Sequence, residues 1–385
     1  MKVASERTKG LGTTIFAEMS ALALRTGAVN LGQGFPDTDG PAPIIDEAVK
    51  ALRGGRNQYA PGPGVPELRT AIAEHQRHWY DLELDPDSEI AVTTGATEAV
   101  AAALLGLVDP GDEVIALEPY YDSYVAGIQM AGGVRRPVTL RAPEFRLDAD
   151  AMRAAVTPRT TTILLNTPHN PSGSVLDAGE LQAIADVAVE HDLIVISDEV
   201  YEHLTFDGRV HIPIATLPGM AERTLTISSG GKTFSFTGWK IGWVCGPAEL
   251  VRAMLTAKQF MSFTSGAPLQ PAIATALGSD DAYFASLTRQ MQDRRDQLCE
   301  GLAKIGFEVF VPEGTYFATT DISGLGYADG VEFCLALPER AGVVAVPHQV
   351  FYDDVDAGRP LVRWAFCKRE EVIAEALDRL QVLAP

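Results

Sequence analysis

Short apolar runs alternate with segments of helical spacing along residues 89–229 of the chain. The apolar runs predict five strands, "EIAVTTG", "DEVIALEP", "TTILLNTP", "LIVISDEV" and "RTLTISS". Segments between them predict helices, as in "TEAVAAALLGLV", "DSYVAGIQMAG" and "AGELQAIADVAVEHD". Continuous apolar strands separated by amphipathic helices are typical of a mostly parallel sheet that is covered on both faces. We therefore predict an α/β fold.

The patterns on either side of this sheet predict a second, smaller unit. We place a large domain at residues 45–280. A small α+β domain at 281–385 contains the helix "QDRRDQLCEGLAKIG", then "FEVFVPEGTYFATTDI", "LVRWAFC" and a last helix. Residues 1–44 form an arm with a helix near "TIFAEMSALALR", followed by "VNLGQGFPD". We expect this arm to pack with the small domain.

Composition and charge narrow the class of protein. Of the 385 residues, 46% are hydrophobic, and the formal net charge is −20. So acidic a surface repels nucleic acid and anionic membrane, and we expect neither as a partner. The longest apolar run, "AVAAALLGLV", is too short for a membrane span, and no apolar signal segment opens the chain, so we expect a cytoplasmic protein. The four scattered cysteines favour structural thiols over a zinc site or disulfides.

Candidate chemistry follows each of the five predicted strands. The loops are "GAT", "EPYYD", "NTPHNPSG", "SDEVYEH" and "SSGGK", in chain order. In open α/β sheets, ligands bind beyond the carboxyl ends of the strands. We therefore predict one binding site at the sheet edge where these loops meet.

The segment "SSGGKTFSFTGWKIGW", residues 228–243, contains a Gly-Lys-Thr that resembles the end of a P-loop. A P-loop needs a glycine six residues before its lysine, and that position is Thr226, inside a predicted strand. An amphipathic helix must also follow, whereas "TFSFTGWKIG" is rich in aromatic residues and glycine. The P-loop interpretation of Lys232 is therefore excluded.

A lysine can instead form a Schiff base with an aldehyde if its amine is neutral often enough to attack. Gly230 and Gly231 would let a flat ring approach Lys232 closely. The aldehyde cofactor implied is pyridoxal phosphate (PLP), which needs such a lysine, an acid at its pyridinium nitrogen and cationic or hydroxyl groups at its phosphate. Asp198, at the end of an apolar strand, is a suitable acid.

The ordered set "NPSG", "SDEVY", "SSGGKTFSFTGWKIGW" and "VRWAFC" resembles the class I/II PLP-dependent aminotransferases. More narrowly, the chain resembles the kynurenine/glutamine transaminases and the actinobacterial N-succinyldiaminopimelate aminotransferases. The resemblance runs from "GQGFPD" to the last strand. It implies the aspartate aminotransferase-like fold, with a mostly parallel seven-stranded sheet in the large domain and a smaller α+β domain.

The resemblance implies a role for each residue around the cofactor ring. Lys232 would form the imine and later carry the proton, and Asp198 would pair with the pyridinium nitrogen. Tyr201 and Asn170 would hydrogen-bond the phenolic oxygen, while Tyr121 would stack on the ring face.

A second set would hold the cofactor phosphate. The backbone N–H groups of Ala96 and Thr97 lie at a predicted helix start, where an anion is favoured. Ser229 and Lys240 would complete the phosphate shell. The resemblance also brings Tyr59, in "NQYAPGPG", from a neighbouring subunit, which implies a homodimer with shared active sites.

The substrate side of the site centres on Arg363 in "LVRWAFC". A guanidinium matches a carboxylate with two parallel hydrogen bonds, so Arg363 would bind the α-carboxylate. Gly34, through its backbone, and Asn170 would assist. The implied reaction is a ping-pong transamination between an L-amino acid and a 2-oxo acid.

Side-chain specificity is the part that the sequence predicts least. Phe16 falls where the kynurenine relatives carry an aromatic residue, which suggests a wall for apolar substrates. Thr97 replaces a bulky aromatic residue of some relatives, so their preference does not transfer. Arg25, Arg56 and Arg135 are unsupported candidates for a distal carboxylate. The actinobacterial resemblance favours glutamate as donor and N-succinyl-2-amino-6-oxopimelate as acceptor.

We consider three alternatives to an aminotransferase, of which the sequence leaves one open and disfavours two. A PLP-dependent cysteine-conjugate C–S β-lyase uses the same lysine and aspartate, so the motifs leave it open. An aminotransferase-like transcription regulator is disfavoured by the acidity and by the lack of a DNA-binding motif ahead of the arm. A metal enzyme is disfavoured because His75 and His78 lie on a polar helix without an evident third ligand, which we interpret as a solvated face. We predict no metal site.

Overall fold

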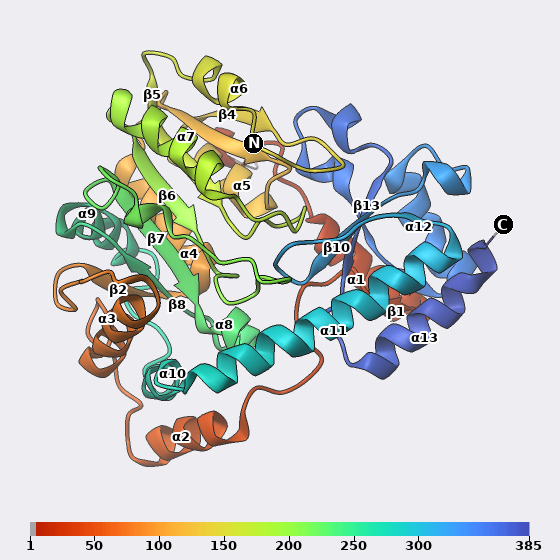
Figure 1. Ribbon diagram of the computed structural model, residues 1–385. Helices are drawn as coiled ribbons and strands as arrows, with labels where there is room; N and C mark the ends of the chain where they lie inside the picture. The colour runs from red at the N-terminus through yellow and green to blue at the C-terminus, as the bar shows by residue number, and fades with distance from the viewer. Residues whose placement is uncertain (1–4, 385) are drawn as a thin grey trace.

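The computed structural model describes residues 5–384 and shows two packed units joined by one long helix (Figure 1). Residues 1–4 of the predicted arm and Pro385 of the predicted small domain lie outside the described residues. The larger unit is built on a seven-stranded sheet in the order β2-β8-β7-β6-β5-β3-β4. Its strands are β2 (Ile90–Thr94), β3 (Glu113–Glu118), β4 (Val134–Thr139), β5 (Thr160–Asn166), β6 (Ile194–Asp198), β7 (Thr224–Ser229) and β8 (Ile241–Cys245).

Strand directions agree with the predicted parallel sheet except at β8. The five predicted strands are all present, and the neighbours from β7 across to β4 pair in parallel. Strand β8 runs antiparallel to both β2 and β7. Only residues 230–240 connect β7 to β8, and this segment is too short for the helical crossover that a parallel strand needs.

Helices cover both faces of the large sheet, because its central strands are apolar on both sides. One face packs against α4 (Gly95–Leu107), α5 (Asp122–Ala131) and α9 (Ala248–Lys258). The other face packs against α6 (Ala149–Ala154) and α7 (Ala178–Glu190) (Figure 1). A third apolar cluster joins β2 and β8 to α2 (Ala42–Arg53), α3 (Pro66–Tyr80) and α10 (Gln270–Leu277).

The smaller unit contains a four-stranded sheet in the order β12-β13-β10-β9. Its elements are β9 (Glu308–Phe310), β10 (Phe317–Asp321), α12 (Gly330–Ala341), β11 (Val343–Val344), β12 (Val346–Pro347), β13 (Leu361–Ala365) and α13 (Glu370–Leu380). Two N-terminal elements, α1 (Ile15–Thr26) and β1 (Val29–Asn30), share its apolar core, and β1 pairs in parallel with β11.

Helix α11 (Asp281–Ile305) links the two units (Figure 1). Its first turn places Phe284 in the cluster of α2, α3 and α10, whereas Leu298 and Leu302 lie in the core of the smaller unit. The domain boundaries at 44 and 280 stay predictions. No helix within residues 5–384 is both long and apolar enough to cross a bilayer.

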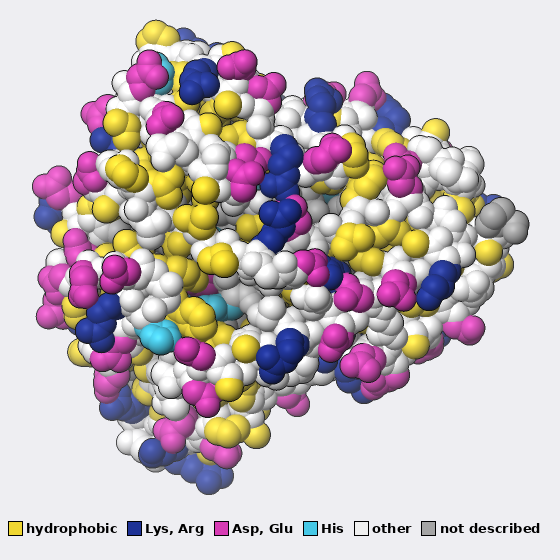
Figure 2. All heavy atoms as spheres, viewed as in Figure 1, with side chains coloured by type: hydrophobic (Ala, Val, Ile, Leu, Met, Phe, Trp, Pro, Cys, Tyr) yellow, Lys and Arg dark blue, Asp and Glu magenta, His cyan; other side chains and the backbone are white. Residues whose placement is uncertain are grey.

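Charged side chains of both signs are spread over the face in Figure 2, with acidic groups on both units. All four cysteines, Cys245, Cys299, Cys334 and Cys367, are buried and unpaired.

Candidate active site

The predicted loops line one cavity of about 930 Å³ between the two units. Strands β2, β3, β5, β6 and β7 run in one direction, so the loops at their carboxyl ends meet at this edge. The cavity is lined by Phe16, Gly34, Ala96, Thr97, Tyr121, Asn170, Asp198, Tyr201, Ser229, Lys232, Lys240 and Arg363. Of the predicted site residues, the structure leaves only Tyr59 outside.

Lys232 lies in the four-residue helix α8 (Gly230–Thr233) directly after β7. Its Nζ donates a hydrogen bond to the hydroxyl of Tyr316 at 2.7 Å. Burial lowers the pKa of Lys232 to about 8, and the positive charges of Lys240 and Arg363 act in the same direction. About one tenth of this amine is therefore neutral at pH 7, far more than for an ordinary lysine, as a nucleophilic lysine requires.

Asp198 ends β6 and is almost fully buried. Its Oδ2 accepts a hydrogen bond from the hydroxyl of Tyr124 at 2.7 Å, and its Oδ1 accepts one from the backbone N–H of Val200 at 3.3 Å. Burial nevertheless raises the pKa of Asp198 to about 6. Among the described residues, the carboxylate accepts hydrogen bonds only from neutral donors, and a cationic ring nitrogen would give it an ion-pair partner.

Arg363 on β13 faces the cavity from the smaller unit. It donates to Oδ1 of Asn170 at 2.9 Å and to the carbonyl of Gly32 at 2.8 Å, while its buried Nε has no partner among the described residues. The guanidinium lies 3.9 Å from the ring centroid of Phe317. Burial lowers the pKa of Arg363 to about 10, so the side chain remains cationic at neutral pH.

Aromatic rings form the wall beside Arg363. Phe16 stacks on Phe351 with ring centroids 5.8 Å apart, and the guanidinium lies 4.9 Å from the centroid of Phe16. Tyr121 caps the start of α5 and contacts Phe16 at a centroid distance of 6.3 Å. Tyr201 is buried, and burial raises the pKa of its phenol.

A cradle for an anion lies at the start of α4. Gly95 has φ +71°, and a side chain there would meet Nζ of Lys240 at 3.1 Å. Gly242 on β8 passes so close that a Cβ atom would lie 2.6 Å from the carbonyl carbon of Gly95. Lys240 is exposed at the cavity rim and has no hydrogen-bond or ion-pair partner among residues 5–384.

Three site residues were missed by sequence reasoning. Tyr316 contacts Lys232, and Tyr124 contacts Asp198. Asn166 ends β5, accepts from the N–H of Asn170 and donates to the carbonyl of Asp198, each at 2.8 Å. Two of them carried a usable signal, because Asn166 begins the predicted loop "NTPHNPSG" and Tyr124 lies in the first turn of the helix that follows Tyr121.

The interpretation of His75 as part of a solvated face is wrong. His78 is exposed, but His75 is buried, with its Nε2 2.8 Å from Nε2 of His203. Glu202 completes a buried group of three potential metal ligands. The short nitrogen–nitrogen distance is that of a hydrogen bond, whereas two nitrogens on one tetrahedral zinc ion lie about 3.3 Å apart. Both carboxylate oxygens of Glu202 also accept hydrogen bonds, from Ser228 and Tyr80.

The three arginines considered for a distal carboxylate are outside the cavity. Arg56 pairs with Glu67 at 2.8 Å, and Arg135 pairs with Asp353 at 2.5 Å. Arg25 is exposed at the end of α1. Among the described lining residues, the cations are Lys232, Lys240 and Arg363.

Residues 26–380 match the family model "Aminotransferase class I and II". The chain belongs to this family. This aminotransferase is 54% identical to the probable N-succinyldiaminopimelate aminotransferase DapC of Mycobacterium tuberculosis over 98% of both chains. It is 40% identical to the methionine aminotransferase of Escherichia coli over 97% of this chain and 96% of that one. It is 38% identical to the kynurenine–oxoglutarate transaminase of Dictyostelium discoideum over 98% and 95% of the two chains.

Solved structures confirm the predicted aspartate aminotransferase-like fold. The N-succinyldiaminopimelate aminotransferase of Mycobacterium tuberculosis superposes with a TM-score of 0.98, at 54% identity over 99% of this chain and 100% of that one. The aspartate aminotransferase of Thermus thermophilus with maleate superposes with a TM-score of 0.92, at 36% identity over all of both chains. Aminotransferases of this class and fold depend on PLP, and the chain is a transaminase. These comparisons give the β-lyase alternative no support.

Proposed function

We propose that this aminotransferase binds PLP in the 930 Å³ cavity and moves an amino group from glutamate to N-succinyl-2-amino-6-oxopimelate. The observation that carries the proposal is the convergence of Lys232, Asp198 and the Asn170–Arg363 pair on this single cavity. The choice of the succinylated substrate rests on the identity to the Mycobacterium tuberculosis relative, a probable N-succinyldiaminopimelate aminotransferase.

The donors and acceptors of the cavity fit the parts of PLP. Lys232 would bond to the aldehyde carbon of PLP, and Asp198 would pair with the ring nitrogen. Asn170 and Tyr201 would donate hydrogen bonds to the phenolic oxygen, and Tyr121 would stack on the ring face. The phosphate would lie in the cradle at Gly95, near the N–H groups of Ala96 and Thr97, with Ser229 and Lys240. When bound, the cofactor supplies an electron sink for the bond to the substrate's α-carbon.

The protein itself supplies the proton transfer and the substrate contacts. The neutral amine of Lys232 would take the α-proton and return it, which general acid–base catalysis by a group of matched pKa permits. Arg363 would bind the α-carboxylate, since its guanidinium is charged and its Nε is free of partners among the described residues. Gly34 and Phe16 would contact the substrate from the side of the N-terminal arm.

A homodimer is part of the proposal. Tyr59 is 84% exposed and contacts Phe263 edge-on, and Phe260, three residues before Phe263, is equally exposed. Large exposed aromatic groups close together are typical of a covered interface. In a dimer, Tyr59 would reach the phosphate of the partner's site. We also propose that the enzyme works in the cytoplasm, as its acidic composition and buried free thiols suggest.

The visible absorbance of the purified protein, recorded before and after addition of single amino acids, tests the proposal. A lysine-bound cofactor gives a yellow band that glutamate should bleach, and the succinylated aldehyde should restore it. Bleaching by methionine or kynurenine but not by glutamate would refute the proposed donor. Release of pyruvate from a cysteine conjugate without a 2-oxo acid would refute the transamination.

A further inference from the structure

Tyr316 connects the proposed nucleophile to the N-terminal arm. It directly precedes β10 and is buried, with 1% of its surface exposed. Its hydroxyl donates to the carbonyl of Gly34 at 2.5 Å and accepts from Nζ of Lys232 at 2.7 Å. The ring packs edge-on against Tyr201, with centroids 5.1 Å apart, so it has little freedom to turn. None of the roles proposed above uses this residue.

The proton count of this chain of contacts fixes the direction of each hydrogen bond. A tyrosine hydroxyl has one proton, and a carbonyl can only accept, so that proton belongs to the bond with Gly34. Burial raises the pKa of Tyr316, so the hydroxyl keeps its proton at neutral pH. Only an oxygen lone pair is left for Lys232. The amine must therefore donate an N–H to Tyr316, which turns the nitrogen lone pair away from the hydroxyl.

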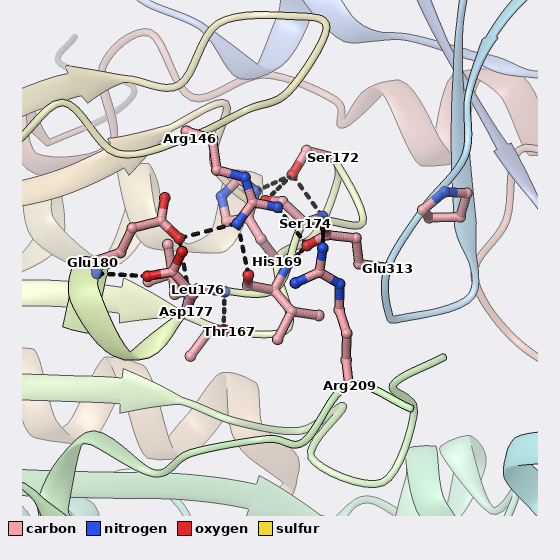
Figure 3. Close-up of polar contacts among 12 residues, drawn as sticks. Arg146, Thr167, His169, Ser172, Ser174, Leu176, Asp177, Glu180, Arg209 and Glu313 are labelled. Atoms are coloured by element: carbon pink, nitrogen blue, oxygen red, sulfur yellow. Dashed lines mark hydrogen bonds and ion pairs between the residues drawn. The ribbon is translucent and has the colours of Figure 1, made fainter. Parts of the chain in front are cut away.

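Glu313, three residues before Tyr316, contacts the loop of residues 169–175, which includes Asn170 (Figure 3). The backbone N–H groups of Glu313 and Gly314 both donate to the carbonyl of Gly173 at 2.9 Å. The carboxylate of Glu313 accepts from the side chains of Arg146 and Arg209, as Figure 3 shows. It also accepts from the N–H of Val175 at 3.0 Å. A carboxylate with several charged donors is firmly held.

We infer that Tyr316 is a positioning residue for Lys232, an inference that rests on the proposed function. Its hydroxyl holds the ε-amine whenever that amine is free of the cofactor, and it directs the nitrogen lone pair toward the cavity. Because the same hydroxyl is bonded to Gly34, the lysine and the substrate-facing arm share one anchor. Loss of the hydroxyl should slow attack by the amine without weakening the contacts that hold the cofactor phosphate.

The test compares full-length wild type with Tyr316→Phe, which retains the buried ring, after removal of bound cofactor. Tyr352→Phe is the matched control, because the buried Tyr352 hydroxyl has no partner among the described residues and the residue does not line the cavity. Stopped-flow absorbance measures the rate of covalent PLP attachment across pH. Pyridoxine 5′-phosphate, which has no aldehyde, measures phosphate and ring binding alone. Thermal unfolding checks that each variant is folded.

We expect Tyr316→Phe to attach PLP about 10- to 100-fold more slowly, since orientation of a nucleophile contributes at least this much. Its Kd for pyridoxine 5′-phosphate should stay within about two-fold of the wild-type value, and Tyr352→Phe should behave as wild type. The pH profile should also shift to a lower apparent pKa, because an ammonium loses a charge-assisted hydrogen bond.

Two results would overturn the inference. Attachment at the wild-type rate in Tyr316→Phe would show that the hydroxyl does not position the amine. A parallel loss of attachment rate and pyridoxine 5′-phosphate binding would assign Tyr316 a purely structural role. Failure of the wild-type protein to attach PLP at all would instead refute the proposed function, and it is distinguishable because it does not depend on the variant.

Discussion

Two groups of buried ionisable residues branch from the same segment, residues 198–203 at the end of β6, and they differ in how their hydrogen bonds are satisfied. Asp198 and Tyr201 line the cavity, whereas Glu199, Glu202 and His203 do not. Both groups are removed from water, so burial alone does not distinguish a functional site from a structural one.

The group away from the cavity is mostly paired internally, and of its fully buried polar atoms only the Nδ1 atoms of His75 and His211 lack a partner among the described residues. His75 bonds His203, and His211 bonds Glu199 at 2.8 Å. Burial lowers the pKa of His203 to about 3, so the pair of imidazoles is neutral. Burial alone would raise the pKa of Glu202, but hydrogen bonds from Ser228 and Tyr80 oppose this effect, and the pKa is lowered overall. Buried polar groups with partners of this kind specify packing.

The ionisable groups at the cavity lack some of the charge and hydrogen-bond partners that they could bind. Asp198 has a raised pKa, Lys232 a lowered one, and Arg363 a buried Nε without a partner among the described residues. Ionisable groups with opposed shifts around a cavity are typical of sites that bind and transform a ligand. The comparison shows that charged groups without full partners beside a cavity indicate function better than burial of ionisable residues does.

The largest effect should follow from removing the nucleophile. Lys232→Ala should lower kcat by about 10³-fold or more, because both the covalent link and the proton transfer are lost. Cofactor binding should weaken, while the fold persists because the side chain that is removed lines the cavity and the buried Gly230, Gly231 and Thr233 of α8 are unchanged. Single-turnover kinetics with glutamate measure this loss. Turnover near the wild-type rate would refute the assignment of Lys232.

Removing the charge on Asp198 should separate chemistry from stability. Asp198→Asn should lower kcat on the order of 10²-fold, since a neutral amide cannot stabilise a cationic ring nitrogen. The raised pKa means that folding disfavours the charged carboxylate at neutral pH, so the cofactor-free variant should be as stable as wild type or more stable. Steady-state kinetics test the predicted fall in kcat, and thermal unfolding of the cofactor-free proteins tests the predicted stability. A destabilised variant would contradict this account.

Arg363→Lys should weaken substrate binding by about 10- to 100-fold, because an ammonium cannot make the paired hydrogen bonds of a guanidinium. The effect should appear in KM for both substrates, with a smaller change in kcat. Steady-state kinetics with glutamate measure it. Arg369→Lys is a suitable control, since Arg369 is an exposed arginine paired with Asp37 and Glu371 outside the cavity. An equal KM change in both variants would argue against a carboxylate contact.

The internally paired group should give the opposite result. Glu202→Gln should reduce the free energy of unfolding by about 1–3 kcal/mol, because an amide cannot accept from both Ser228 and Tyr80. We expect little change in kcat, since Glu202 does not line the cavity. Denaturant unfolding and steady-state kinetics measure the two quantities. A large loss of kcat with unchanged stability would contradict the division into two groups.

The last prediction is a pH dependence of cofactor uptake. Attack requires the neutral amine, and the pKa of Lys232 is lowered to about 8, so the attachment rate should rise with pH and level off above about 8. As the pH falls below about 6, Asp198 becomes protonated, and cofactor affinity should fall as well. Stopped-flow absorbance between pH 5 and about 9 measures both the attachment rate and the cofactor affinity. A flat profile would contradict both pKa shifts.

The sequence predicted the parts of the fold that depend on continuous apolar runs. Strands β2, β3, β5, β6 and β7 follow from such runs. Strand β4 was missed because it is a partly exposed edge strand with a central Pro137, and β8 because it is short and contains Gly242. The direction of β8 depends on the length of the connection before it rather than on its own residues.

The candidate site shows the same division. Residues at or just after the ends of strands, such as Asp198 and Lys232, could be located from the sequence because the carboxyl ends of parallel strands lie at one edge of the sheet. Tyr316 comes from the other unit, so its contact with Lys232 depends on tertiary packing. His75 was assigned to the wrong environment because helix periodicity does not reveal that His203 and Phe284 cover it.

The central claim is that the unsatisfied group at the cavity binds PLP covalently through Lys232. Borohydride reduction of the PLP-loaded protein, followed by peptide mass spectrometry, tests this claim directly. We predict a single phosphopyridoxyl modification on the peptide that contains Lys232. Modification of another lysine, or none under conditions that label a known transaminase fully, would contradict the account.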